Sequence, residues 1–329
     1  MRSSSPLAVA LYGAPILLAA ACGTAPVRVP VMRPAEIDMA PYASVAVGEM
    51  RGRGDPRALS DALEEALVSS HKFRVVDRQH LLQTMQELQL SSKDLADPTK
   101  AAKLGQLLAA EALIYGDVDE RYNERIDETP YRTKEGKQHV VRVLTGEAAV
   151  RATFKVLDLS TGRLLTARTY EDKRQETNRI EDARPAPIDR EELTWRARRT
   201  VLDRFLKAIV PYQEYVFARF EKDADIPQLE GGIGWAERGN WDKAKEAFNN
   251  AVADAGKNPK VGAKQLGKAY WDLGLAHEYS GDYDNAAKMV QKAYDVGQDK
   301  DYLRELDGID RLRSEAKISR QAGSTSIDR

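Results

Sequence analysis

Few residues of this chain have the types and spacing that chemistry requires. The Gly-rich stretch Arg51–Pro56 is not followed by Gly-Lys-Ser/Thr, so it predicts an ordinary turn rather than a phosphate loop. The chain has no Gly-x-Ser-x-Gly, no His-Glu-x-x-His and no Walker lysine, and its paired acids fall within charge runs typical of solvated surfaces. The histidines are far apart, without metal-ligand spacing: His71, His80, His139 and His277. We therefore expect no enzymatic activity, no catalytic residue, no metal site and no cofactor.

The only cysteine, Cys22, is the strongest candidate for a covalent modification. Arg2 and the apolar run Leu7–Ala21 are typical of a secretory signal, which is too short to span a bilayer as a helix. The stretch LAAACG around Cys22 resembles the bacterial lipobox, which implies cleavage before Cys22 and its acylation, with palmitate as a typical acyl group. Gly23 in place of an Asp implies an outer-membrane lipoprotein facing the periplasm. The alternative is a soluble periplasmic protein that is cut nearby and keeps a free thiol.

Length and composition bound the remaining possibilities. A chain of 329 residues is too long for one average domain, so two are expected. An apolar content of 42% is enough to bury cores, and a charged content of 31% keeps the surface soluble. Fifty basic residues against fifty-one acidic ones leave no net field to attract nucleic acid. One cysteine cannot form a disulfide within the chain.

The stretch Lys72–Leu90 organises the first two thirds of the sequence. Phe73 begins a short β-branched run typical of a buried strand, Asp77 offers an N-cap, and Leu81 begins the apolar face of a helix, so both Phe73 and Leu81 should be buried. Around this unit we expect strands at Tyr42–Met50, Ala112–Tyr122, Glu147–Leu159 and Leu164–Tyr170. We expect helices at 56–69 and 98–110, and a long helix that begins at Asp189 and that Pro211 kinks or interrupts before Phe220. Gly116 within its strand indicates a bulge or a close backbone approach. The order predicts an α/β fold, with helices covering a mixed sheet.

Three segments are together similar to the CsgG-type family of outer-membrane lipoproteins, which assemble the curli secretion channel. They are FRVVDRQHLLQTMQEL from Phe73, LGQLLAAEALIYGDV from Leu104 and FKVLDLSTGRLL from Phe154. The resemblance covers roughly residues 37–215, and the Arg78 region and the Ser160-Thr161-Gly162 turn are its most telling parts. It implies a periplasmic α/β domain without catalytic residues.

Two charged segments depart from that family's pattern. Its members insert two amphipathic β-hairpins per subunit into the bilayer, at stretches that correspond here to about Tyr122–Gly146 and Tyr170–Asp189. Both segments carry dense charge, and a lipid-facing Arg or Lys at the bilayer midplane costs about 2–4 kcal/mol. We therefore expect solvated loops or extended hairpins outside lipid.

The last third contains an internal repeat that resembles the tetratricopeptide repeat. Trp235–Ala244 is echoed by His277–Ala286, with Gly239 and Gly281 turning the chain. We expect helix pairs whose aromatic residues mainly pack between helices, while some of them line a face for a protein partner or a secreted peptide. These candidate partner-binding residues are Trp235, Trp241, Tyr270, Trp271, Tyr279 and Tyr283.

The resulting hypothesis is a lipid-anchored assembly or scaffold protein that faces the periplasm. A CsgG-like domain would serve docking or homo-oligomerisation, and the repeats would bind the partner. Two alternatives stay open: a subunit of an oligomeric outer-membrane secretion channel, and a lipoprotein activator of peptidoglycan synthesis. The expected organisation is a signal peptide at 1–21, a tether at 22–36, the α/β domain at 37–221, a linker at 222–232, repeats with a capping helix at 233–313, and a flexible tail at 314–329.

Overall fold

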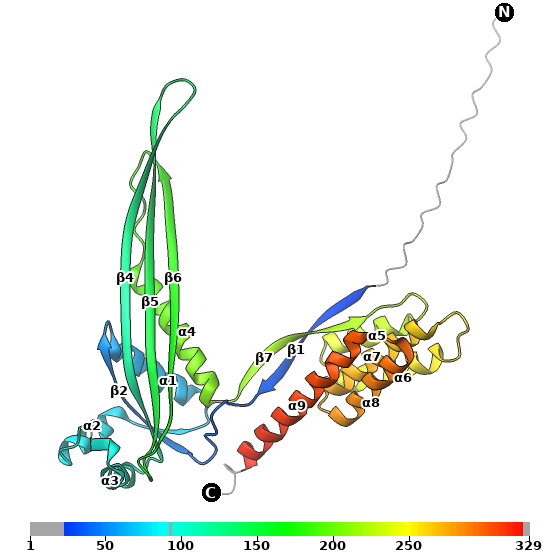
Figure 1. The fold of residues 1–329 in the computed structure, drawn as a ribbon, viewed down its shortest axis with the longest axis horizontal. Coiled ribbons are helices and arrows are strands. Elements are labelled where there is room, and N and C mark those ends of the chain that lie inside the picture. Colours follow the sequence, from blue (N-terminus) through cyan, green and yellow to red (C-terminus); the bar gives the residue numbers. More distant parts are fainter. Residues whose placement is uncertain (1–22, 92–93, 325–329) are drawn as a thin grey trace, which may run out of the picture. The chain divides into compact units, whose positions relative to one another are not determined.

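The computed structural model describes residues 23–91 and 94–324, which divide into two compact units (Figure 1). We call Met32–Tyr212 the sheet unit. We call the strand segment Gly23–Val31 together with Gln213–Glu315 the helical unit. The fold is mixed α/β, with a mixed sheet and helices followed by a region of several helices, so the predicted fold class is confirmed.

The sheet unit contains a five-stranded sheet in the order β3-β2-β4-β5-β6. Strand β2 pairs in parallel with β3 and β4, whereas β5 pairs antiparallel with β4 and β6, so the sheet is mixed as expected. The close approach predicted at Gly116 is present, because a Cβ there would lie 1.8 Å from the Thr153 carbonyl oxygen. The strands are β2 (Ser44–Arg53), β3 (Arg74–Val76), β4 (Ala112–Arg132), β5 (Gln138–Asp158) and β6 (Leu164–Glu181).

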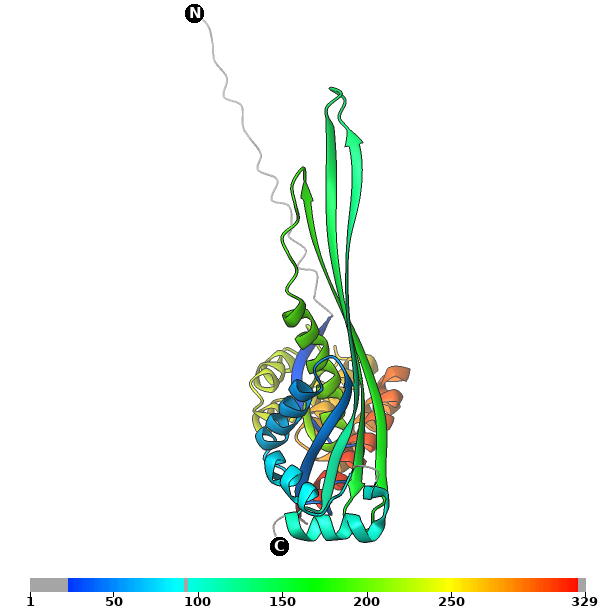
Figure 2. The same ribbon diagram turned by 90° about the vertical axis from the view of Figure 1, so that its left-hand side faces the viewer.

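Helices cover both faces of the base of this sheet (Figure 2). Helices α1 (Pro56–Ser69) and α4 (Arg190–Ile209) pack on one face, where the rings of Phe154 and Phe205 stack with centroids 4.2 Å apart. Helices α2 (Arg78–Glu87) and α3 (Pro98–Leu108) pack on the other face, and a short 3-10 turn lies at Asp94–Ala96. Leu81 is fully buried as predicted, but Phe73 is only half-buried, because it lies beside the short edge strand β3.

Strands β4, β5 and β6 continue beyond the end of β2 (Figure 1), and α4 covers only the nearer part of this extension. The last β2–β4 pair is Arg53 with Asp119, whereas β4 and β5 remain paired out to Arg132 and Gln138. We call this three-stranded extension the distal blade; it comprises residues 120–132, 138–150 and 172–181. The first charged segment is therefore an extended hairpin. The second is not a hairpin, because β6 ends at Glu181 and the chain returns to α4 without forming another strand.

In the helical unit, a two-stranded ribbon packs on helices. Val27 and Val29 of β1 share a core with Ala218 and Phe220 of β7, and the Phe220 ring stacks on the Phe248 ring with centroids 5.5 Å apart. The elements are β1 (Thr24–Arg33), β7 (Tyr212–Glu221), α5 (Gln228–Glu237), α6 (Trp241–Ala255), α7 (Ala263–Tyr279), α8 (Tyr283–Gly297) and α9 (Lys300–Ser324).

Four expected segments differ from what the structure shows. Most of the expected tether at 22–36 is strand β1, since its valines alternate toward the core and its prolines face outward. The region after Pro211 is strand β7 rather than a continued helix. Helix α5 begins at Gln228, inside the expected linker at 222–232, and α9 continues through residues 314–324, where a flexible tail was expected.

Candidate functional site

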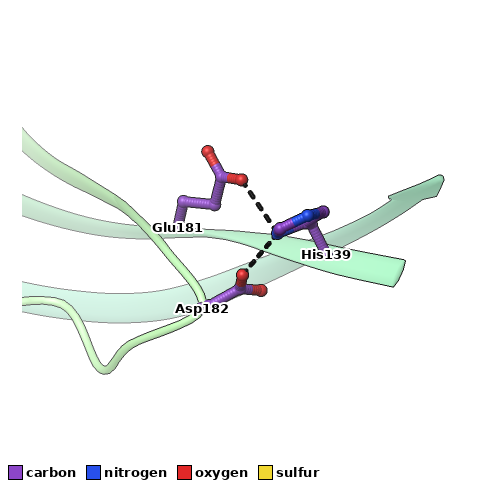
Figure 3. Close-up of side chains that lie close together, drawn as sticks. All are labelled: His139, Glu181 and Asp182. Atoms are coloured by element: carbon purple, nitrogen blue, oxygen red, sulfur yellow. Dashed lines mark hydrogen bonds and ion pairs between the residues drawn. The ribbon is translucent and has the colours of Figure 1, made fainter. Parts of the chain in front are cut away.

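Three side chains with metal-ligand atoms meet near the far end of the distal blade (Figure 3). His139 is the second residue of β5, Glu181 ends β6, and Asp182 follows directly. The Nδ1 atom of His139 lies 2.6 Å from Oδ2 of Asp182 and 3.2 Å from Oε1 of Glu181. The three ligand atoms lie within 4.8 Å of one another, so this tip cluster has a donor set that a divalent cation accepts.

The tip cluster also forms hydrogen bonds that join the end of β5 to the end of β6, and we call this arrangement the clasp. The Val140 N–H donates to Asp182 Oδ1 over 2.8 Å, and the Asp182 N–H donates to the Val140 carbonyl over 2.9 Å. The Val140 amide and His139 hold the pKa of Asp182 below its usual range. The Tyr131 hydroxyl donates to Glu181, which raises the pKa of Tyr131, and its ring stacks on His139. Both carboxylates are thus engaged in closing the strand ends.

Sequence reasoning did not find the tip cluster. His139 and Asp182 lie 43 positions apart, and neither has a neighbour in sequence that marks a ligand motif. Only the register that pairs Val141 with Glu181 brings them together, and that register is not visible in a single sequence. The β4–β5 hairpin could have been predicted, but not the register of β6 against β5.

A buried ion pair fixes the base of the distal blade. Arg198 of α4 donates from Nε to Glu120 Oε1 over 2.8 Å and from Nη2 to Glu120 Oε2 over 3.0 Å. The Asp55 N–H donates to the same carboxylate over 2.9 Å. At Gly54, where φ is +103°, an added Cβ would lie 2.4 Å from the Glu120 Cβ. The Gly-rich turn expected at 51–56 therefore closes over Glu120 and joins β2, β4 and α4.

Charges along the extended strands are mostly engaged with one another. Arg53 and Arg121 both contact Asp119 at 2.6–2.7 Å, and Lys155 contacts Asp117 at 3.0 Å. Further out, the pairs Arg142–Glu128, Arg125–Asp127 and Arg174–Asp172 lie 2.7–3.2 Å apart. These charges stand on regular strands rather than on loops. The charges of the distal blade are therefore largely matched, while Ile126, Tyr131 and Ile180 are exposed apolar side chains on the same strands.

The six candidate aromatic residues lie in the helical unit and pack against its core. Trp271 is buried: its Nε1 donates to the Arg219 carbonyl over 2.9 Å, and its ring stacks on Tyr302 with centroids 4.6 Å apart. The other five are partly buried, and two of them, Trp241 and Tyr279, meet with ring centroids 5.9 Å apart. Lys243 lies over the Trp235 ring and Lys292 over the Tyr270 ring. The structure therefore does not gather the six into one exposed face.

The helical unit also buries two carboxyl groups. Asp272 of α7 is fully buried and accepts a hydrogen bond from the Glu221 N–H over 2.7 Å, while burial raises its pKa well above the usual range. Glu278, also on α7, has its pKa raised to about 9 by burial and by the neighbouring carboxyl of Glu305 on α9. Glu278 is therefore protonated at neutral pH, and it fills a position that a neutral side chain suits better.

The predicted lipid-attachment residue, Cys22, lies outside the described residues. Among residues 23–91 and 94–324, no helix has the length and the apolar character needed to cross a membrane.

Comparisons with known proteins found similarities to the sheet unit. Residues 43–181 match the family model described as curli production assembly/transport component CsgG. Among solved structures, the LpoB C-terminal domain from Salmonella enterica is 18% identical, with a TM-score of 0.23, covering 40% of this chain and 83% of that one. The NMR structure of Escherichia coli LpoB is 17% identical, with a TM-score of 0.26, covering 53% and 84%.

Lipoprotein GNA1162 from Neisseria meningitidis is 15% identical, with a TM-score of 0.26, covering 40% of this chain and 79% of that one. No curated protein matches the chain. Identities and TM-scores this low add nothing to a functional assignment, which rests on the family match. That match covers both central segments of the resemblance, from Phe73 and from Leu104, and the turn at Ser160–Gly162.

Proposed function

We propose that this protein is a lipid-anchored assembly or scaffold protein of the outer membrane that faces the periplasm. Cys22 carries the lipid, the sheet unit docks or self-associates, and the helical unit binds a protein partner or a secreted peptide. The observation that carries the proposal is the match of residues 43–181 to a curli production assembly/transport family. The sheet unit is thus similar to proteins named for assembly and transport.

The helical unit supports a partner-binding role through its construction. Two helix pairs, α5 with α6 and α7 with α8, turn at Gly239 and Gly281, where φ is +69° and +83°. Stacked helix pairs of this kind are the tetratricopeptide-like arrangement that we infer, and such repeats expose extended surfaces for proteins. Five of the six aromatic candidates are half-buried, and we assign these to partner contact, because the sixth, Trp271, belongs to the core: Trp235, Trp241, Tyr270, Tyr279 and Tyr283.

Co-purification from the native membrane tests this function. The full chain is crosslinked in cells, purified in detergent, and its bound proteins are identified by mass spectrometry. We expect a specific protein that is retained by the parent chain and weakened by Tyr270→Ala, with Asn250→Ala at an exposed position of α6 as the control. A chain that captures no protein above a control lipoprotein would contradict the scaffold role.

A second candidate is a subunit of an oligomeric secretion channel. The distal blade favours it, because β4 has no neighbour on its β2 side beyond Asp119 and β6 is an edge strand. Unpaired edges are templates for pairing with another chain. Discrete conductance steps in planar bilayers, together with a ring in native-membrane extracts, would favour this candidate over the scaffold.

A further inference from the structure

The start of the folded chain lies very close to the proposed lipid anchor. Strand β1 begins at Thr24, and the Lys222 N–H donates to the Gly23 carbonyl over 2.8 Å. Val27 and Val29 of the same strand are buried in the helical core. Only Gly23 therefore separates Cys22 from a strand fixed to the helical unit, and consecutive Cα atoms are about 3.8 Å apart. A lipid on Cys22 leaves no tether between bilayer and protein.

The contacts between α7 and β7 show which surface lies at this end of the unit. Trp271 bonds the Arg219 carbonyl, Asp272 bonds the Glu221 amide, and Lys268 pairs with Asp223 at 3.0 Å. Lys268, in the second turn of α7, thus contacts Lys222 and Asp223, the two residues that follow β7, and Lys222 is the residue bonded to Gly23. The beginning of α7 and the loop that precedes it at 256–262 therefore lie toward the end of β7 that is bonded to Gly23.

This end of the helical unit presents lysines. Lys257, Lys260 and Lys264 are exposed, and in the described part of the chain none of them forms an ion pair with a carboxylate. Two acids near this end have partners: Asp254 accepts from the Gln228 side chain over 3.1 Å and Asp301 from Arg304 over 2.7 Å. Asp225 is also exposed at this end, where the three lysines outnumber it. The three ammonium groups are therefore available to an anionic surface.

We propose that this end of the helical unit rests on the membrane, with Lys257, Lys260 and Lys264 contacting anionic phospholipid headgroups beside the anchor. The inference rests on the proposed lipid at Cys22 and goes beyond it, because it fixes which surface of the unit faces the bilayer. A basic cluster next to an acyl anchor is a second membrane signal, and each lysine near an anionic leaflet favours the bound state about fivefold.

A site-specific fluorophore tests the proposal in the lipidated full chain. A lipidated Cys22 has no free thiol, so Pro259→Cys supplies the one reactive thiol, exposed between Lys257 and Lys260. The matched label site is Glu237→Cys, which is exposed at the end of α5. The Trp241–Tyr279 contact places this turn beside the far end of α7, a helix of 17 residues, about 25 Å from its start.

Vesicles of phosphatidylglycerol and phosphatidylcholine that carry a headgroup quencher give the readout. We expect quenching at position 259 to be at least threefold stronger than at position 237. Inserting a flexible 12-residue Gly/Ser linker (roughly 20 Å root-mean-square) after Gly23 should leave that quenching in place in anionic vesicles. The further change of Lys257, Lys260 and Lys264 to Glu should then reduce it about tenfold or more.

Equal quenching at both positions in a vesicle-bound chain overturns the proposed orientation while leaving the lipid anchor intact. If changing the three lysines to Glu in the linker variant leaves the quenching at position 259 unchanged, the proposed headgroup contact is overturned. A purified chain that carries no lipid and does not associate with vesicles overturns the inference together with the anchor part of the proposed function.

Discussion

The Glu120–Arg198 pair allows a quantitative test of how the distal blade is held. Both side chains are less than a tenth exposed, and two hydrogen bonds of 2.8 and 3.0 Å join them. Arg198→Met keeps the apolar stem but leaves the Glu120 carboxylate with only the Asp55 amide. Breaking a buried pair by removing one partner costs about 3–5 kcal/mol. We expect a loss of that size in the free energy of unfolding of the sheet unit.

Arg53→Met is the matched control, because Arg53 pairs with Asp119 at the surface and an exposed pair contributes only about 0–1 kcal/mol. The assay is urea unfolding followed by pulsed hydrogen exchange and mass spectrometry, with peptides from α4 and β4 as reporters of the sheet unit alone. The double variant Glu120→Gln with Arg198→Met removes the unpaired charge and should recover part of the loss. Equal unfolding midpoints for Arg198→Met and Arg53→Met would refute the reasoning.

Three further predictions concern single sites. The pKa of Glu278 is raised from 4.5 to about 9 in the folded chain. As the pH rises between these values, Glu278 loses its proton in the unfolded chain before it does so in the folded chain, so the free energy of unfolding falls. Glu278→Gln should therefore stabilise the helical unit at pH 8 and have no effect at pH 4, as measured by urea unfolding midpoints. Gly116→Ala should abolish soluble expression or lower the midpoint strongly, unlike Gly231→Ala, whose Cβ meets nothing within 4 Å. Because the pKa of Asp182 is lowered in the folded chain, the clasp should hold at neutral pH and weaken only when the pH falls below the ordinary range of a carboxyl group. Val140 amide protection should fall there and, at neutral pH, in Asp182→Ala, which removes the acceptor oxygen.

Helices were predictable where a capping side chain and an apolar face agree. Asp77 was expected as an N-cap, and Asp97 caps α3 in the same way: each accepts a hydrogen bond from the second residue after it, over 3.1 and 2.9 Å. The apolar spacing that starts at Leu81 predicted a buried face of α2, and Leu81 is fully buried, whereas Leu82 is 46% exposed. In these stretches, local propensity and tertiary packing favour the same structure, so the sequence alone is sufficient.

Strands were less predictable where they depend on a distant partner. Pro26 and Pro30 made β1 resemble a tether, yet proline is compatible with an edge strand when its missing N–H faces away from the neighbour. The partner of β1 is β7, about 190 positions later in the chain. The alternation of Ala218 and Phe220 in β7 was not used to predict a strand, because a helix was expected to continue past Pro211. The tip cluster was missed for the same reason, since long-range register is not encoded in local pattern.

The intact mass of the mature chain purified from native outer membrane tests the central claim most directly. The account predicts a chain that begins at Cys22 and carries the added mass of a diacylglyceryl group and an amide-linked acyl chain. The Cys22→Ser variant should lack that mass and leave the membrane fraction. A parent chain that begins at another residue, or that begins at Cys22 without added lipid mass, would contradict the lipid anchor and the membrane-scaffold function that depends on it.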